Sequence, residues 1–493
     1  MNEATPRRYR FGDSSQPGVL LGLSVSQAVP VISGILWLAL CLQTPLPMSP
    51  VVGLIGTAAG LVVAFGRWRG APITEILVPT IDLWARRPRR RRWHRPVAAT
   101  RGAAVLPEPL PPVLAGVEII ELPESEEPMG AAHDRRAGTL TAVLQVSGDG
   151  FPLAPTDEQD TMLDTWGTSL SPFARQGCPV TRVAWHHWSR PLTPSIAPGA
   201  GQRTEAEADH AALVDQQATV SMTHDVLITV TVDQRRVVAR SRGSRQDAAL
   251  AALADEVERF RSRLAAAELS AGRPLSRVQM ARAIRERSDP SCSAQLAVLH
   301  RSLATAAGRV LPTPIEWGPM TVEAAWHHVR VDGACHRTYR IAAWPPLPVP
   351  PDWLGALVTE PGVTRTVTVV MEPVPLVESA RRADREAMAR EADADARSRK
   401  GFRISARDRK RIAEVEERER ELAQGHAEFR FVGLVDISAP DVSALTEAAA
   451  TVEQAAARSL VDLRPLEARH DRAWVACLPL GRDVTTTRGG LAP

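Results

Sequence analysis

The sequence predicts an α+β protein, in which an N-terminal two-helix transmembrane hairpin precedes a cytoplasmic mixed α/β body with a charged helical-hairpin insertion. Three observations predict this class. Residues 14–66 contain no charged side chain, residues 96–116 form a proline-rich spacer, and strand and helix patterns alternate beyond it. With 493 residues, 44% hydrophobic content and a net charge of +3, the chain has room for two or three domains. A wholly basic nucleic-acid binder is excluded, so any such role is confined to a local patch.

The uncharged interval divides into two apolar stretches. The first runs from Val19 to Leu42 and the second from roughly Met48 to Gly66, with three prolines between residues 43 and 50 predicting a turn. Since about 20 apolar residues suffice to cross a bilayer, two spans are expected. The second span disfavours a cleaved signal peptide, which would have a single short apolar core.

Arginine placement predicts the orientation of the two spans. Arg7, Arg8 and Arg10 precede the first span, Arg67 and Arg69 follow the second, and the turn between them carries no positive charge. Because positive residues favour the inner side of a membrane, we expect a two-pass protein of the cell (cytoplasmic) membrane with both termini in the cytoplasm.

The stretch "WARRPRRRRWHRP", residues 84–96, has seven arginines between positions 86 and 95. Residues 71–84 before it carry an apolar helical stripe and are expected to lie at a membrane interface. Anionic lipid is the expected partner of the run, contact with nucleic acid is the alternative, and a simple stop-transfer flank is compatible with the first. The predicted membrane-surface residues are Arg67, Trp68, Arg69, Trp84, Arg86, Arg87, Arg89, Arg90, Arg91, Arg92, Trp93 and Arg95.

Residues 1–95 therefore form the hairpin with its basic flank, 96–116 the linker, and 117–290 a first α+β domain. Apolar alternation predicts strands in this domain at 139–146, 180–188 and 225–232. Capping boxes at Thr156/Gln159 and Ser244/Asp247 predict the starts of two helices, and residues 276–287 predict a third.

A second α+β domain is expected at 291–483, followed by a flexible tail at 484–493. Strands are predicted at 334–344, 363–371 and 428–438, with a short helix near Trp353 and a longer one from Val442 to Ser459. The tetrapeptide "AWHH" occurs at 184–187 and again at 325–328. Two domains of related design are conceivable, although four residues are weak support for a duplication.

A highly charged insertion at 377–424 interrupts the second domain. Glu414 with Arg418 is one of its i,i+4 pairs, and Gly401 divides it into two expected helical arms. The insertion is either a solvated helical hairpin or a docking arm for a partner. The candidate docking residues are Arg403, Arg407, Arg409 and Lys410.

No catalytic centre is predicted. A P-loop requires a glycine-rich loop that ends in lysine, and neither Lys400 nor Lys410, the only lysines, follows such a loop. The five cysteines form no CxxC pair. Adjacent residues on a strand point to opposite faces, so the pairs His186/His187, His327/His328 and Cys335/His336 should diverge. We therefore expect no enzyme activity, cofactor or metal.

Several segments carry a resemblance to known proteins. "RYRFG", residues 8–12, with the hairpin resembles the PrgI-like inner-membrane subunit of conjugative type IV secretion systems. "TAVLQVSGDGF", "HDVLITVTV", "HRTYRIAAWP" and "ACLPLGRD" resemble the N-terminal, non-motor part of the assembly ATPase of those systems. Actinobacterial membrane proteins that fuse the two parts in one chain are similar to most of residues 8–483.

In that ATPase family, a segment like Leu478–Gly481 leads into the P-loop motor, whereas this sequence ends at Pro493. The resemblance implies a non-catalytic inner-membrane platform that docks a separate P-loop ATPase, contacts other membrane secretion subunits and forms a homo-oligomer. The alternatives are a structural subunit of a type VII-like export complex and a membrane-tethered nucleic-acid-binding protein that contacts DNA directly. An unrecognised hydrolase is a further alternative.

Overall fold

The computed structural model describes most of the body and the hairpin. The described ranges are residues 25–44, 48–68, 70–86, 91–95, 109–122, 128–147, 151–192, 221–237, 244–266, 269–293, 317–345, 349–382 and 427–482, with the isolated positions 209, 295–296, 384–385 and 388. Most of the predicted insertion, including both expected arms beyond residue 388, lies outside these residues.

Helices and strands alternate along most of the described chain. The α-helices are α1 (Val25–Gln43), α2 (Ser49–Phe65), α3 (Ile73–Ala85), α5 (Thr156–Leu170), α7 (Arg245–Ala266), α8 (Arg277–Ser288), α10 (Gly355–Thr359), α13 (Val442–Arg458) and α14 (His470–Cys477). The strands are β1 (Arg67–Trp68), β2 (Ala71–Pro72), β3 (Arg92–His94), β4 (Val117–Glu121), β5 (Gly130–Asp134), β6 (Thr139–Ser147), β7 (Val180–Pro191), β8 (Met222–Asp233), β9 (Ser270–Pro274), β10 (Thr321–Ala324), β11 (Val329–Val331), β12 (Ala334–Ala343), β13 (Thr364–Pro373), β14 (Phe429–Ala439) and β15 (Asp462–Pro465). Short 3₁₀ turns occupy Phe151–Leu153, Ser171–Ala174 and Pro290–Cys292.

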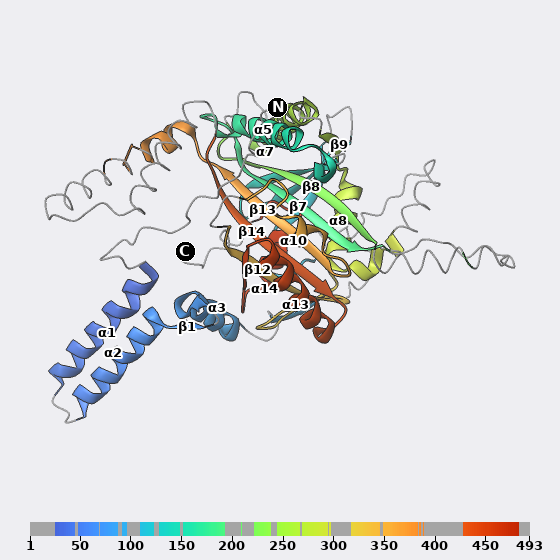
Figure 1. Cartoon of the computed structure of the whole chain (residues 1–493). Coiled ribbons are helices and arrows are strands. Elements are labelled where there is room, and N and C mark those ends of the chain that lie inside the picture. Colours follow the sequence, from blue (N-terminus) through green and yellow to red (C-terminus); the bar gives the residue numbers. More distant parts are fainter. Residues whose placement is uncertain are drawn as a thin grey trace, which may run out of the picture.

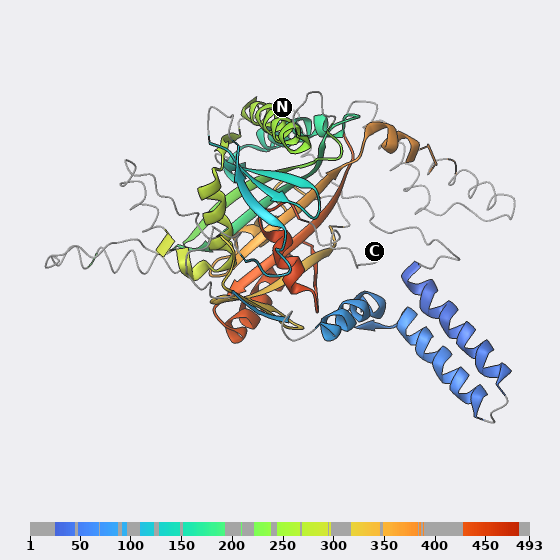
Figure 2. The ribbon, with the colours of Figure 1, turned by 180° about the vertical axis from the view of Figure 1, so that it is seen from behind.

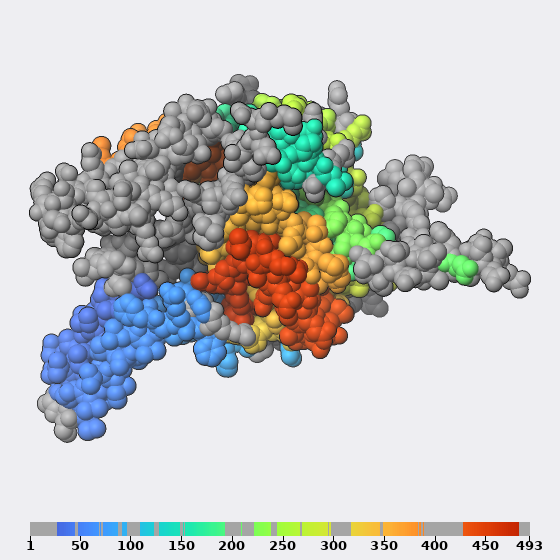
Figure 3. Space-filling model, viewed as in Figure 1, coloured from blue at the N-terminus to red at the C-terminus, as the bar shows by residue number. Residues whose placement is uncertain are grey.

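Helices α1 and α2 lie side by side and project away from the body (Figures 1 and 2). Small residues let the two backbones approach closely, since a Cβ on Gly34 would meet Thr57 and one on Gly53 would meet Leu38. The Thr57 hydroxyl donates to the Gly34 carbonyl across the interface at 2.9 Å. Many large apolar side chains of the two helices remain exposed. The space-filling view shows the pair standing out from the body (Figure 3).

The predicted transmembrane hairpin is wrong: among the described residues, no helix is long and apolar enough to cross a membrane. Helix α2 has 17 residues, and at about 1.5 Å per residue it is shorter than a hydrocarbon layer of about 30 Å. Helix α1 has 19 residues, but Pro30 lies inside it and Gln27 and Gln43 shorten its apolar part. The predicted two-pass location in the cell membrane, with both termini in the cytoplasm, depended on this hairpin and is therefore also wrong. A charge-free interval does not by itself fix the length of the helices within it.

The body is mixed α/β and is built on one large antiparallel sheet. Thirteen strands of the described chain belong to it, in the order β3-β10-β11-β12-β14-β13-β7-β8-β6-β5-β4, with β15 beside β12 and β9 beside β6. Strands β7 and β13 pair in the middle, so the two halves expected at 117–290 and 291–483 share a continuous sheet.

The two halves repeat one architecture. The order β4-β5-β6-α5-β7-β8-α7-β9-α8 corresponds to β10-β11-β12-α10-β13-β14-α13-β15-α14. The pairings repeat as well, because β6 pairs with β8 and β9 just as β12 pairs with β14 and β15. The "AWHH" tetrapeptides do not mark this duplication, since one lies in β7 and the other between β10 and β11. Equivalent positions are instead marked by "VTR" at 180–182 and 363–365 and by "RPL" at 273–275 and 464–466.

Helices cover both faces of the sheet. Helices α5 and α7 cover one face of the first half, and α10 and α13 cover the same face of the second half. The Trp185 side chain of β7 packs against both of these clusters and joins them. Helices α8 and α14 cover the opposite face. Both faces of the central strands are buried, as expected for a three-layer fold. One face is mainly apolar, and the other carries buried polar side chains such as Thr229, Thr231 and Thr368.

Most strands and helix starts lie where the local sequence pattern predicts them. The Ser244/Asp247 capping box is confirmed, since the Asp247 N–H donates to the Ser244 hydroxyl at 3.1 Å and the Ser244 N–H donates to the Asp247 carboxylate. The capping box predicted at Thr156 is wrong. Pro155 is the cap residue of α5, and the Gln159 side chain donates to the Phe151 carbonyl instead.

The Arg365 guanidinium lies at the end of α10 and forms no ion pair with a carboxylate of the described residues. It is 1% exposed and donates to the carbonyls of Leu357, Val358, Glu360 and Val363. Burial lowers the pKa of Arg365 to about 10, so the group stays charged at neutral pH.

We predict that Arg365→Ala lowers the free energy of unfolding by about 3 kcal/mol, because it leaves several buried carbonyls without donors. Urea unfolding followed by circular dichroism measures the change. Arg430→Ala is the control, since Arg430 is 57% exposed in its ion pair with Glu378, and its replacement should cost about 0.5 kcal/mol or less. Equal effects of the two substitutions would contradict this role for Arg365.

Candidate functional site: an arginine-lined cleft

The first arginine of the basic run is bound by the body. Arg86 lies 2.6 Å from Asp471 of α14 and 2.8 Å from Asp82 of α3, and Arg472 lies 2.8 Å from the same Asp82 oxygen. Burial opposes ionisation of Asp82, but the two guanidinium groups outweigh it and lower the pKa of that carboxyl. These ion pairs attach α3 to α14 across almost the whole length of the sequence.

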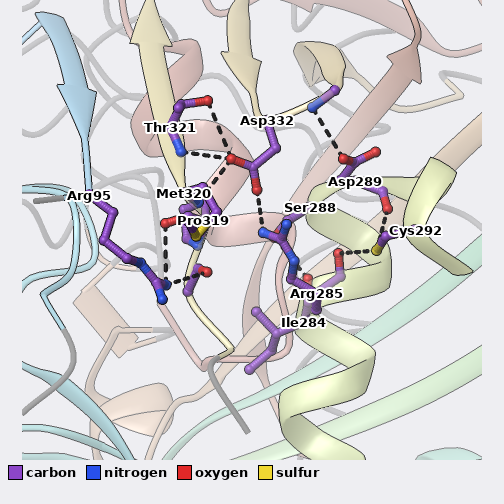
Figure 4. Close-up of polar contacts among 12 residues, drawn as sticks. Arg95, Ile284, Arg285, Ser288, Asp289, Cys292, Pro319, Met320, Thr321 and Asp332 are labelled. Atoms are coloured by element: carbon purple, nitrogen blue, oxygen red, sulfur yellow. Dashed lines mark hydrogen bonds and ion pairs between the residues drawn. The ribbon is translucent and has the colours of Figure 1, made fainter. Parts of the chain in front are cut away.

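The end of the run is also held by the body. Strand β3 pairs with β10, and the Arg95 N–H donates to the Met320 carbonyl at 2.8 Å. Figure 4 shows the neighbouring hub, Asp332, which adopts a left-handed conformation with φ of 49°. Its carboxylate accepts the N–H groups of Met320 and Thr321 at 2.8 and 2.6 Å and pairs with Arg285 of α8. Strand β3, which follows α3, therefore forms part of the body. It lies beside the contact between α8 of the first half and Asp332 of the second.

The remaining predicted site residues divide into three groups. Arg92 pairs with Glu323 at 2.7 Å, and the Arg91 Nε donates to the Leu83 carbonyl at 2.6 Å. Trp93 packs against the core, whereas Trp68 and Trp84 are exposed and Arg67 lies on the surface in β1. The others lie outside the described residues, namely Arg69, Arg87, Arg89, Arg90, Arg403, Arg407, Arg409 and Lys410.

Sequence reasoning missed a cleft of about 830 Å³ beside these contacts. It lies where the two ends of the curved sheet approach each other, between β10 of the second half and the β5–β6 turn of the first. Seven arginines and four aspartates line it. They are Arg86, Arg91, Arg136, Arg182, Arg235, Arg472, Arg482, Asp82, Asp134, Asp233 and Asp471.

Three of the lining arginines have no carboxylate within hydrogen-bonding distance among the described residues. The exposed Arg136 has no side-chain partner there, and its aliphatic stem lies against Gly116. Arg235 donates to the Ala137 carbonyl at 3.0 Å and lies 3.9 Å from Asp233, and Arg91 donates to the Leu83 carbonyl and lies over the Trp84 ring. The cleft consequently carries an excess of positive charge at its rim.

The segment after α14 forms part of the cleft wall. The buried Arg182 donates to the Gly481 carbonyl at 2.6 Å and to the Glu372 carboxylate at 2.9 Å. Gly481 has φ of 65° and lies against the Thr141 and Thr231 hydroxyls, where a Cβ would clash. The next residue, Arg482, binds Asp134 at 2.7 Å. Glycine is required at this position both for its backbone conformation and for the close approach.

The histidines and cysteines named in the sequence do not converge on a site. The buried His336 binds Asp436 at 2.8 Å and the Ser288 carbonyl at 2.9 Å, whereas Cys335 points into the core on the opposite face. His186 lies 3.1 Å from the Thr368 hydroxyl, and His187 stacks on a neighbouring histidine on the other side of the sheet. Within the described part of the chain, no group of three or more His, Cys, Asp and Glu side chains could hold a metal ion.

Comparison of the sequence with known protein families and with characterised proteins finds no match.

We predict that Asp471→Asn loosens α3, because Arg86 loses its buried ionic partner. Hydrogen exchange should speed up in α3 by at least about tenfold, equivalent to about 1.4 kcal/mol of local stability, with no change in α7. Glu323→Gln removes the exposed partner of Arg92 and serves as the control. Unchanged exchange in α3 of the Asp471 variant would show that the ion pair does not hold the helix.

We also predict that stability falls as the pH falls from about 6.5 towards 4. Burial and the nearby His224 lower the pKa of His187 to about 4, and burial with the nearby Arg287 lowers that of His186 to about 3. Unfolded histidines take up protons near pH 6.5, so the stability present above this pH is lost below it.

Replacing His187 by Phe should keep the stacking and remove roughly 3 kcal/mol of the loss that accumulates by pH 4. Unfolding in urea at a series of pH values measures it, with the exposed His94→Phe as the control. A pH profile that is the same in wild type and His187→Phe would overturn this assignment.

Proposed function

We propose that this chain is a non-catalytic subunit of a conjugative type IV-like secretion machine and that it docks a separate P-loop ATPase. The resembling segments fall on framework elements of the body. "TAVLQVSGDGF" includes most of β6, "HDVLITVTV" lies in β8, "HRTYRIAAWP" lies in β12, and "ACLPLGRD" follows from the end of α14. The resemblance therefore concerns corresponding strands of the two halves as well as the exit from the last helix.

The position of Leu478–Gly481 carries the proposal. In the resembling ATPases this segment leads into the motor, and here it packs into the body beside the arginine-lined cleft. The Gly481 carbonyl is held by Arg182, and the Arg482 side chain by Asp134. A motor that docks near this point would meet the body at the place where the related motors are covalently attached.

The composition supports a division of labour between two chains. The 493 residues contain no GxxxxGK[ST] sequence, so this stretch of protein does not supply a phosphate-binding loop of that kind. The described body instead offers a rigid sheet, a projecting helical pair and a charged cleft, which are features of an assembly subunit. We propose that another chain supplies the hydrolysis and that several copies of this chain surround it.

Contacts of the basic run with the body count against the nucleic-acid alternative. It requires the basic run to be available, yet Arg86 and Arg92 pair with carboxylates of the body and Arg91 with a backbone carbonyl. These contacts leave less unpaired charge along the run than the sequence alone predicts.

We predict that affinity purification of the tagged full-length protein in mild detergent recovers a P-loop ATPase in near-stoichiometric amount, as identified by mass spectrometry. Recovery of the protein alone, or only with small helical export substrates, would contradict the proposal.

Gly481→Ala should reduce recovery of the ATPase several-fold, because a Cβ there collides with Thr141 and Thr231 and displaces the segment. Gly362→Ala is the matched control. Gly362 also has a positive φ, of 76°, but has open space around it. Equal recovery with both variants would show that the segment does not determine docking.

A further inference from the structure

The geometry of the cleft points to a ligand of defined chemistry: we propose that the arginine-lined cleft binds an acidic, partly apolar segment of a partner polypeptide. The inference goes beyond the proposed function, because it names the chemistry of the ligand and holds for any partner that carries such a segment.

Charge is the first argument. Arg136 and Arg235 project from two neighbouring turns, the β5–β6 turn and the turn after β8, and the Arg235 side chain is 67% exposed. The Asp134 carboxylate is already occupied by Arg482 and by two backbone N–H groups, so it cannot neutralise Arg136 further. Planar guanidinium groups bind carboxylates through paired hydrogen bonds. Arg136 has no carboxylate partner among the described residues, and Arg235 lies 3.9 Å from Asp233, beyond hydrogen-bonding distance.

The second argument is an unpartnered group in the wall. Arg182 is 8% exposed, and its Nε has no hydrogen-bond partner in the described chain, although both of its terminal nitrogens are bound. One oxygen of the buried Asp471, Oδ1, is likewise without a partner there. Buried polar atoms normally find partners, so a wall in which two charged groups each retain one unpartnered atom is typical of a site that is completed by a ligand.

The composition of the wall selects a polypeptide. Trp93, Val322 and Val475 give the cleft an apolar side, with Pro111 and Pro112 at its edge. A volume of about 830 Å³ exceeds what a single inorganic anion fills and falls in the range, about 300–1,000 Å³, of sites that take organic ligands. A segment that alternates acidic and aliphatic side chains matches both sides of the cleft.

A nucleic acid fits the same walls poorly. Asp82 and Asp233 lie among the arginines and remain 43% and 23% exposed. A phosphate backbone carries a negative charge at every step and would meet these carboxylates. A polypeptide offers amide N–H donors between its acidic side chains, which suit a wall of mixed charge.

The test uses full-length protein in mild detergent and a short fluorescein-labelled peptide that alternates glutamate and leucine. Fluorescence anisotropy measures its binding. Peptides of the same length that alternate glutamine or lysine with leucine report on the need for negative charge, and a labelled single-stranded oligonucleotide tests the competing class of ligand. We expect the glutamate peptide to bind, to weaken with added salt and to exceed the other three probes in affinity.

The variants exploit two pairs of adjacent arginines. Arg136→Glu combined with Arg235→Glu reverses both rim charges and should weaken binding at least tenfold. Arg135→Glu combined with Arg236→Glu makes the same change of charge at exposed neighbours that do not line the cleft, and binding should stay within twofold of wild type. Circular dichroism melting of both variants establishes that each is folded.

Three results would overturn the proposal. The first is no binding of the glutamate peptide to wild-type protein, and the second is an equal loss in the two charge-reversal variants. The third is tighter binding of the oligonucleotide with displacement of the peptide, which would assign the cleft to nucleic acid. Because this assay contains no ATPase, its outcome is separate from the recovery of a motor.

Discussion

The pairing of β7 with β13 is the contact on which the rest of the structure depends. Seven residue pairs, from Arg365 opposite Ser189 to Met371 opposite Val183, join the two halves through backbone hydrogen bonds. Without this pairing each half would end in a long unpaired strand, which is a template for aggregation. His186 and Thr368 meet across the pair at 3.1 Å in a fully buried setting. The two repeated halves therefore form a single sheet.

This pairing also sets the position of the cleft. Once the halves are joined in the middle, the curvature of the sheet brings its outer strands towards each other around α8 and α14. One apolar cluster contains Val117 of β4, and Trp93 of β3, at the opposite end of the strand order, packs against it. The arginine-lined cleft is the polar opening, or mouth, between these outer strands. The Arg86–Asp471 pair then attaches α3, and with it the projecting helical pair, beside this mouth.

Local pattern was sufficient for most of the secondary structure and insufficient for long-range contacts. Alternating apolar residues located β6, β8 and β14, because one face of each strand packs its apolar side chains against helices of the body. Two arginines of the basic run show what the local pattern leaves out. Besides the local Asp82, the acids that bind Arg86 and Arg92 are Asp471 and Glu323, which are hundreds of residues away. No local rule reveals such partners.

The cleft and the duplication could not be predicted from the sequence, for related reasons. The cleft combines residues of α3, β3, two turns, β10 and α14, so no contiguous motif signals it. The duplication had a weak signal in the repeated "VTR" and "RPL" tripeptides, and the more conspicuous "AWHH" repeat pointed to non-equivalent positions. The N-terminal interval was interpreted from its composition, and among the described residues no helix is long and apolar enough to cross a membrane.

The most direct test of a body built on one shared sheet is its equilibrium unfolding in urea, followed separately in each half. Trp188 of β7 reports on the first half and Trp474 of α14 on the second, and variants that retain one or the other tryptophan as the fluorescent probe separate their signals. If β7 and β13 join the halves into a single cooperative unit, both probes should give the same midpoint and the same slope. Two transitions with separate midpoints would contradict this account and show that each half is stable without the other.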